Sequence, residues 1–295
     1  MHAVAFSFAL ALTLASGISH AAEFKTVDLP SGGTHYEDVG AGPTVVLIHG
    51  VSGPLQVWDK TTSALVDAGY RVIRYDLFGR GMSERLPDAA YDLPLYVRQL
   101  GELTEALAVA GQLRLVGSSF GAVIATAFAL EHPRNVLSVT LVGPAGFPIE
   151  VPALAQLRDV PLVGDAVAYL LGKTIIKKQN RKYAYDDELF TTFWPYFDAQ
   201  LEVPGTTEAM LATMRNAPVT AFVESYGALG KTGIPVGVIW GRQDATFPYD
   251  NHVALLEAIP HARLVTVEEA AHLPQWERPE VTNAALLAML AEGSR

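Results

Sequence analysis

Apolar positions after residue 22 alternate between short β-rich runs and longer stretches with helical spacing. Continuous apolar runs such as VVLI (Val45–Ile48) and VGVIW (Val236–Trp240) are typical of parallel strands covered by helices on both faces. The predicted strands are His35–Val39, Thr44–Ile48, Arg71–Tyr75, Leu113–Val116, Val136–Val142, Pro235–Trp240 and Arg263–Val267. The predicted helices are Gln56–Ala68, Leu93–Ala110, Phe120–Glu131, Thr220–Leu229, Tyr249–Ala258 and Pro279–Ala291. The alternation predicts an α/β fold with a mostly parallel sheet.

Two segments depart from this alternation. Gly40-Ala41-Gly42-Pro43 is a turn signal between two close strands, so we expect the sheet to start as an antiparallel hairpin there. Residues 146–218 show helical patterns, several prolines and no clear buried strand, which predicts a helical insertion between core segments 22–145 and 219–295. The insertion holds five aromatic residues in Leu189–Phe197 (LFTTFWPYF), and we expect most of them to pack it onto the core.

The first residues suggest export. Ala3–Ile18 is almost wholly apolar, and Ser19-His20-Ala21-Ala22 has the small residues that suit cleavage after Ala21. The run is too short for a membrane span of about 20 apolar residues. We therefore predict a signal peptide over residues 1–21, a periplasmic or secreted protein, and no membrane span after processing. Because the start of the run carries His2 but no Lys or Arg, a cytoplasmic location is the alternative.

Composition narrows the class of partner. The chain has 21 Lys+Arg against 31 Asp+Glu, a formal net charge of −10. This balance argues against nucleic acid, whose binding needs clustered cations. The chain contains no cysteine, which excludes disulfides, thiolate metal sites and a cysteine nucleophile.

A candidate nucleophile lies where a predicted strand gives way to a predicted helix. Gly117-Ser118-Ser119-Phe120-Gly121 matches G-x-S-x-G, the strand–turn–helix elbow that exposes its central serine. The central serine is Ser119, and the flanking glycines let strand and helix approach closely. The start of the helix also favours the oxyanion of acyl transfer.

A serine nucleophile needs a histidine and a carboxylate later in the chain. Asp244 follows the strand PVGVIW and His272 follows the strand RLVTV, so both fall at the carboxyl ends of parallel strands. The other position for the acid, after Val136–Val142, contains no carboxylate. Asp76 also follows a strand, but it opens the glycine-rich run DLFGRGMS and is interpreted as a structural hydrogen-bond acceptor.

Two backbone N–H groups are candidates for the oxyanion hole. His49-Gly50-Val51-Ser52-Gly53 follows the strand TVVLI, and this loop can aim the N–H of Val51 at the site while Phe120 supplies the second donor. His49 itself is interpreted as structural. No metal-ligand spacing is present, and no metal or organic cofactor is implied.

Together, His49-Gly50, Asp76 with Gly79-x-Gly81-x-Ser83, Gly117-x-Ser119-x-Gly121, Gly241-x-x-Asp244 and Ala271-His272 resemble the α/β-hydrolase fold family. The resemblance runs from about Thr34 to the C-terminus. It implies an eight-stranded, mostly parallel sheet, a helical cap over residues 146–218, and oxyanion donors at Val51 and Phe120. Relatives that open epoxides or displace halide carry Asp where this chain has Ser119.

The expected activity is hydrolysis of carboxylic esters by Ser119, His272 and Asp244, on an apolar small-molecule ester. Relatives that hydrolyse carbon–carbon bonds of β-diketones share triad and cap, so this reaction is the alternative. A non-catalytic ligand-binding member of the fold is a further alternative. The sequence pattern sets no oligomeric state.

Overall fold

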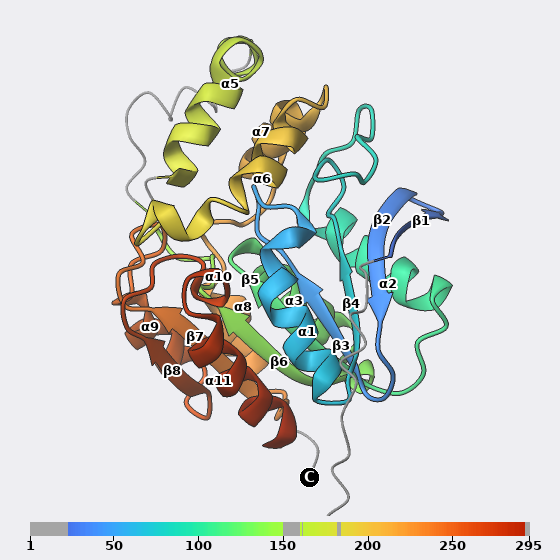
Figure 1. Ribbon diagram of the computed structural model, residues 1–295, viewed down its shortest axis with the longest axis vertical. Helices are drawn as coiled ribbons and strands as arrows, with labels where there is room; N and C mark the ends of the chain where they lie inside the picture. Colours follow the sequence, from blue (N-terminus) through green and yellow to red (C-terminus); the bar gives the residue numbers. More distant parts are fainter. Residues whose placement is uncertain (1–22, 150–159, 161, 182–183, 293–295) are drawn as a thin grey trace, which may run out of the picture.

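The computed structural model describes residues 23–149, 160, 162–181 and 184–292, which form an eight-stranded sheet in the order β1-β2-β4-β3-β5-β6-β7-β8 (Figure 1). The strands are β1 (Phe24–Leu29), β2 (Gly32–Val39), β3 (Thr44–Ile48), β4 (Arg71–Tyr75), β5 (Leu113–Ser118), β6 (Val136–Val142), β7 (Val236–Gly241) and β8 (Arg263–Val267). Strands β3 to β8 pair in parallel, and β1 and β2 are antiparallel additions at one edge. This arrangement confirms the predicted fold class.

The prediction of a hairpin across Gly40–Pro43 is wrong, because the two strands that this turn connects do not pair with each other. Strand β2 pairs with β1 and β4, while β3 pairs with β4 and β5, so β4 lies between the two strands that the turn connects. The turn is nevertheless tight: a Cβ on Gly40 would lie 2.4 Å from the carbonyl oxygen of Tyr70. The true hairpin joins β1 to β2. Strand β1 was not predicted, because FKTVDL has neither a continuous apolar run nor a regular alternation and is mostly exposed.

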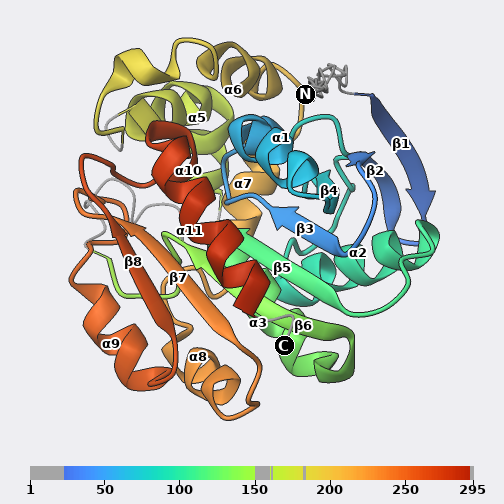
Figure 2. The same ribbon diagram turned by 60° about the horizontal axis from the view of Figure 1, so that its bottom comes forward.

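Helices cover both faces of the sheet (Figures 1 and 2). One face carries α1 (Asp59–Asp67), preceded by η1 (Leu55–Trp58), and α11 (Pro279–Glu292); the other carries α2 (Leu93–Ala106), α3 (Phe120–Glu131), α8 (Val223–Gly230) and α9 (Asn251–Ala258). A short turn, η2 (Pro133–Asn135), follows α3. Every residue from Phe120 to Ala129 is buried, so α3 is the central helix of its layer and is apolar all round.

The chain between β6 and α8 contributes helices to the described part of the structure. They are α5 (Val163–Arg181), η4 (Asp187–Phe190), α6 (Trp194–Leu201) and α7 (Thr206–Asn216), and α5, α6 and α7 lie together at one end of the molecule (Figure 1). The predicted signal peptide lies outside the described residues. Within those residues, no helix combines the length and apolar character that a membrane crossing needs.

Aromatic side chains fasten this helical segment to the core. Phe190, Phe193, Trp194 and Phe197 are buried, and they pack with one another and with Trp276 of α10 (Pro274–Glu277) at centroid separations of 5.1–6.3 Å. Such offset and edge-to-face contacts add to the stabilisation from burial. The expectation that most of these aromatics serve packing is therefore confirmed.

Candidate active site

Ser119 lies in a strained turn between β5 and α3. Its backbone has φ 55° and ψ −118°, a conformation that non-glycine residues rarely adopt and that is often retained at functional sites. Both flanking glycines are required by close contact. A Cβ on Gly117 would lie 2.2 Å from the carbonyl oxygen of Gly121, and a Cβ on Gly121 would lie 2.2 Å from that of Ile48. The G-x-S-x-G pattern therefore forms the tight elbow that was predicted from it.

His272 and Asp244 are joined directly. Nδ1 of His272 lies 2.9 Å from Oδ2 of Asp244, although the two residues lie in loops after different strands, β8 and β7. Asp244 accepts three further hydrogen bonds, from the backbone N–H groups of Thr246 and Phe247 and from the indole of Trp240. Because the carboxylate accepts all of these, Nδ1 of His272 carries the proton and Nε2 keeps a free lone pair.

Contacts through β6 place this pair beside the elbow. The N–H of Ser119 donates to the carbonyl of Val142 at 2.9 Å. The next residue, Gly143, is so close to the pair that an added Cβ would lie 3.0 Å from the carbonyl oxygen of His272 and 3.4 Å from Oδ2 of Asp244. The structure thus brings the three predicted catalytic residues together at the carboxyl ends of the parallel strands. It also shows glycine at the position that sequence analysis weighed as a second place for the acid.

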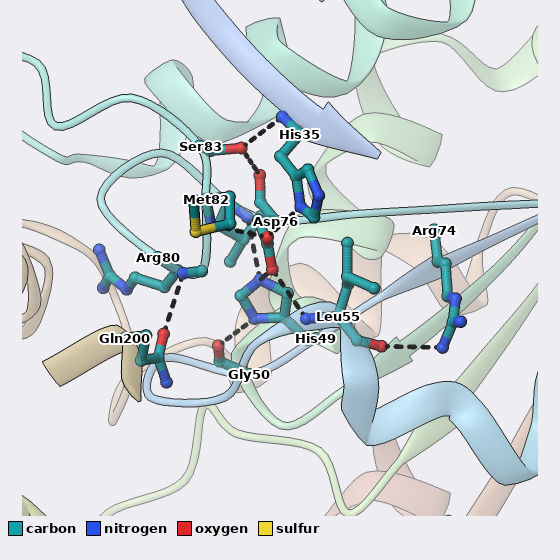
Figure 3. A network of polar contacts seen from close by, with 12 residues as sticks. His35, His49, Gly50, Leu55, Arg74, Asp76, Arg80, Met82, Ser83 and Gln200 are labelled. Atoms are coloured by element: carbon teal, nitrogen blue, oxygen red, sulfur yellow. Dashed lines mark hydrogen bonds and ion pairs between the residues drawn. The ribbon is translucent and has the colours of Figure 1, made fainter. Parts of the chain in front are cut away.

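The loop after β3 packs against Ser119, the predicted nucleophile. A Cβ on Gly50 would lie 3.0 Å from Cβ of Ser119, so this loop faces the elbow. The N–H of Leu77 donates to Nε2 of His49 at 2.9 Å, which places the proton of His49 on Nδ1. Nδ1 then donates to the carbonyl of Gly50 at 2.7 Å (Figure 3). Since C=O and N–H point in opposite directions across a trans peptide, His49 sets the direction of the Val51 N–H.

His49 is neutral at physiological pH. The residue is completely buried, and this burial lowers its pKa to about 4, a shift that the nearby Asp76 carboxylate opposes. The structural role predicted for His49 is consistent with this geometry, because both ring nitrogens are used in holding backbone groups. Phe120, the other predicted oxyanion donor, is the first residue of α3, where N–H groups have no partner within the helix.

Asp76 organises the loops behind the site. Its carboxylate accepts from Nδ1 of His35 at 2.7 Å and from the backbone N–H groups of Leu55 and Met82 at 2.8 and 2.9 Å (Figure 3). Burial would raise the pKa of Asp76, but the hydrogen bonds from His35 and Met82 and the neighbouring histidine rings outweigh it and hold this pKa below its ordinary value. A Cβ on Gly81 would lie within 2.2 Å of the carboxylate, which explains the glycine-rich run. Asp76 has the structural role predicted for it.

Comparison with known proteins decides the family. The family model for the alpha/beta hydrolase fold matches residues 43–279. The chain belongs to the α/β-hydrolase fold family. This α/β-hydrolase is 30% identical to the 2-hydroxy-6-oxononadienedioate/2-hydroxy-6-oxononatrienedioate hydrolase of Paraburkholderia phymatum, over 93% of this chain and 98% of that protein. It is 27% identical to the 2-hydroxy-6-oxo-6-phenylhexa-2,4-dienoate hydrolase of Comamonas testosteroni, over 92% and 96% of the two chains.

Solved structures agree with this assignment. A meta-cleavage product hydrolase from Pseudomonas fluorescens has a TM-score of 0.72 and 26% identity, covering 91% of this chain and 97% of that one. A thermophilic esterase from Thermogutta terrifontis has a TM-score of 0.77 at 24% identity, covering 92% and 99%, and shares the fold. The chain is thus a hydrolase of this fold, whereas the predicted ester specificity is not what the similar curated proteins are named for.

Two buried polar residues of this α/β-hydrolase were not predicted from the sequence. Glu277 accepts the N–H of Tyr185 at 2.6 Å and that of Ala271 at 2.7 Å, so it ties the helical segment to the loop of His272. Gln275 donates to Oγ of Ser118 at 3.2 Å. No local spacing marks either residue. The only signal in the sequence is that two polar residues flank Trp276.

Proposed function

We propose that this α/β-hydrolase cleaves the carbon–carbon bond next to the ketone of a conjugated 2-hydroxy-6-oxo-dienoate. The observation that carries the proposal is the similarity, over more than nine-tenths of the chain, to hydrolases named for such substrates. The gathering of Ser119, His272 and Asp244 supports it, because a serine hydrolase of this kind needs those groups. Ester hydrolysis, the first expectation from sequence, becomes the second candidate.

The chemistry of such a substrate explains why a serine hydrolase suffices. In the 2-hydroxy-dienoate, moving the enol proton to C5 gives a 2-oxo group conjugated through the C3–C4 double bond. When a nucleophile adds to the C6 carbonyl, the C5–C6 bond can break, because its electron pair spreads into the 2-oxo group as a dienolate. Acyl transfer to the enzyme and then to water completes the hydrolysis without a further co-reactant.

Each residue then has a definite role. Oγ of Ser119 attacks the C6 carbonyl while Nε2 of His272 takes the hydroxyl proton, and Asp244 holds the ring with Nδ1 protonated. The N–H groups of Val51 and Phe120 bind the oxyanion. His272 gives this proton to the departing dienolate and, neutral again, activates the water that releases the acid.

We also propose that residues 146–218 act as a cap over this site. Three side chains support this role: Asn180 of α5 and Gln200 of α6 contact Ser52 in the loop after β3, and Arg80 behind that loop donates to Thr213 of α7. Tyr185 meets Glu277 beside the His272 loop. The segment therefore contacts both loops that flank the elbow and can exclude water from the reacting bond.

One observation favours the ester alternative. A dienoate substrate carries a carboxylate, and a buried cation near the site would bind it. Arg80 is completely buried and contacts the oxyanion loop, but it donates to four uncharged protein groups. These are the carbonyls of Val51 and Phe78 and the hydroxyls of Tyr96 and Thr213. Because these groups occupy most of its N–H donors, Arg80 has little capacity left to bind a substrate carboxylate. A neutral ester does not need such a cation.

The test compares both substrate classes in one preparation. We expect wild type to remove the conjugated absorbance of 2-hydroxy-6-oxo-6-phenylhexa-2,4-dienoate in a steady-state assay, and Ser119→Ala to lose turnover while keeping its thermal midpoint. Rates on p-nitrophenyl esters from acetyl to decanoyl are measured alongside. Turnover of esters with none of the dienoate would replace the proposal by the ester alternative, and retained activity in Ser119→Ala would remove Ser119 as nucleophile.

A further inference from the structure

A glutamine of the helical segment joins the two loops behind the oxyanion site. Gln200 lies on α6 and is only 3% exposed. Its Nε2 donates to the carbonyl of Ser52 at 2.7 Å. Its Oε1 accepts the N–H of Gly81 at 3.0 Å, the contact drawn from Gln200 in Figure 3. One side-chain amide thus connects the loop after β3 with the loop after β4, using both of its polar atoms.

The other two helices of the segment reach the same place. Asn180 on α5 accepts a hydrogen bond from the hydroxyl of Ser52 at 2.7 Å. Thr213 on α7 accepts from Nη2 of Arg80 at 2.7 Å, and Nε of Arg80 donates to the carbonyl of Val51, also at 2.7 Å. Contacts from α5 and α6 therefore end on Ser52, and the contact from α7 reaches Val51 through Arg80.

These contacts hold the peptide groups that follow Val51, whereas His49 holds the peptide group that precedes it. His49 holds the carbonyl of Gly50, which belongs to the same peptide as the Val51 N–H. The two carbonyls that follow, of Val51 and Ser52, are held by Arg80 and Gln200. A donor in an oxyanion hole must be held within a fraction of an ångström of its working position, because a small displacement costs much of its effect.

We propose that Gln200 is a positioning residue that holds the Val51 N–H in place through its own two hydrogen bonds. The inference rests on the proposed function, in which Val51 binds the oxyanion. Gln200 itself has no contact with the reacting atoms. Its amide acts on the loop after β3 through the hydrogen bond to the Ser52 carbonyl.

The first test measures the rate constant for labelling of Ser119 by a fluorophosphonate, a reaction that needs the oxyanion hole whichever substrate class is correct. Gln200→Met keeps the volume but loses both hydrogen bonds, and we expect labelling to slow by about 10- to 100-fold. The matched control is Leu201→Ala, which loosens α6 at a fully buried neighbour. We expect this control to lose thermal stability while labelling within about threefold of wild type.

A second variant supplies a signature that loss of packing would not produce. In Gln200→Glu, the protonated carboxyl group can donate to the Ser52 carbonyl and accept from Gly81, as the amide does. The ionised form instead sets a carboxylate oxygen against that carbonyl. The labelling rate of Gln200→Glu relative to wild type should therefore rise as pH falls, while the ratio for Gln200→Met stays flat.

The outcomes separate this inference from the proposed function. Labelling of wild type and Gln200→Met at equal rates would overturn the positioning role alone, as would equal slowing in Leu201→Ala. A ratio for Gln200→Glu that does not change with pH would also contradict it. Failure of wild type to label at all would overturn the proposed serine chemistry, and the role of Gln200 with it.

Discussion

The loops after β3 and β8 each carry a histidine at the same edge of the sheet, yet the two side chains are held in opposite ways. His49 is fully buried, and both of its ring nitrogens contact backbone groups. His272 is 12% exposed and has a carboxylate on Nδ1. A backbone carbonyl on Nδ1 fixes a loop, whereas a carboxylate there stabilises the charge that a general base acquires. The partner of each ring, more than the ring itself, decides its role.

The two aspartates near these histidines also differ in what their carboxylates hold. Asp244 lies within hydrogen-bond distance of His272, whereas Asp76 contacts His35 and lies 3.9 Å from Nε2 of His49. Asp76 joins β2, the start of η1 and the loop of Met82, whereas Asp244 holds the imidazole of His272 against its own loop. Substitution of the two aspartates should therefore give the largest difference in turnover between the two loops.

The largest effect is expected for Asp244→Asn. An asparagine amide can donate to Nδ1 of His272, which moves the ring proton to Nε2 and removes the base, so kcat should fall by roughly 10³- to 10⁴-fold with little change in KM. Asp76→Asn is the matched control, and it should mainly lower the thermal midpoint because one backbone donor loses its acceptor. Steady-state rates at equal foldedness decide between them. A greater loss of kcat in Asp76→Asn would show that the acid was assigned wrongly.

The second prediction concerns acid stability and His49. Its folded pKa of about 4 lies below the ordinary histidine value of 6.5, so the unfolded chain binds a proton first as pH falls. The stability contributed by neutral His49 is complete above pH 6.5 and is lost between pH 6.5 and about 4, a loss of roughly 3 kcal/mol. Urea unfolding at several pH values should show a weaker decline in His49→Gln, which has no titrating group. The same change at exposed His132 should leave the decline as in wild type, and equal declines in all three proteins would contradict the burial argument.

The sequence predicts those parts of the fold and site whose signals lie within a few residues of one another. Ser119, Asp244 and His272 are marked by local patterns, because an elbow and a loop after a strand need particular residues within a few positions. Gln200 and Glu277 act across 148 and 92 residues, on Ser52 and Tyr185, and nothing near them in sequence announces those partners. Strand β1 was missed for a related reason, since an edge strand buries few side chains and its pairing with β2 leaves a weak apolar pattern.

The smallest change in turnover and stability is expected at Glu277. Its titration should change folding stability with pH in the direction opposite to that of His49. Burial raises the pKa of Glu277, although the N–H groups of Tyr185 and Ala271 pull it back. For an acid with a raised folded pKa, the unfolded chain ionises first as pH rises, so stability falls from pH 4.5 upward until the folded group has also ionised. Glu277→Gln should remove this decline and slow turnover a few-fold, because an amide can accept only one of the two N–H groups and loosens the loop of His272. Glu280→Gln on the exposed start of α11 is the control for both readouts. If the two variants show the same pH dependence of unfolding, Glu277 does not titrate in the way its burial requires.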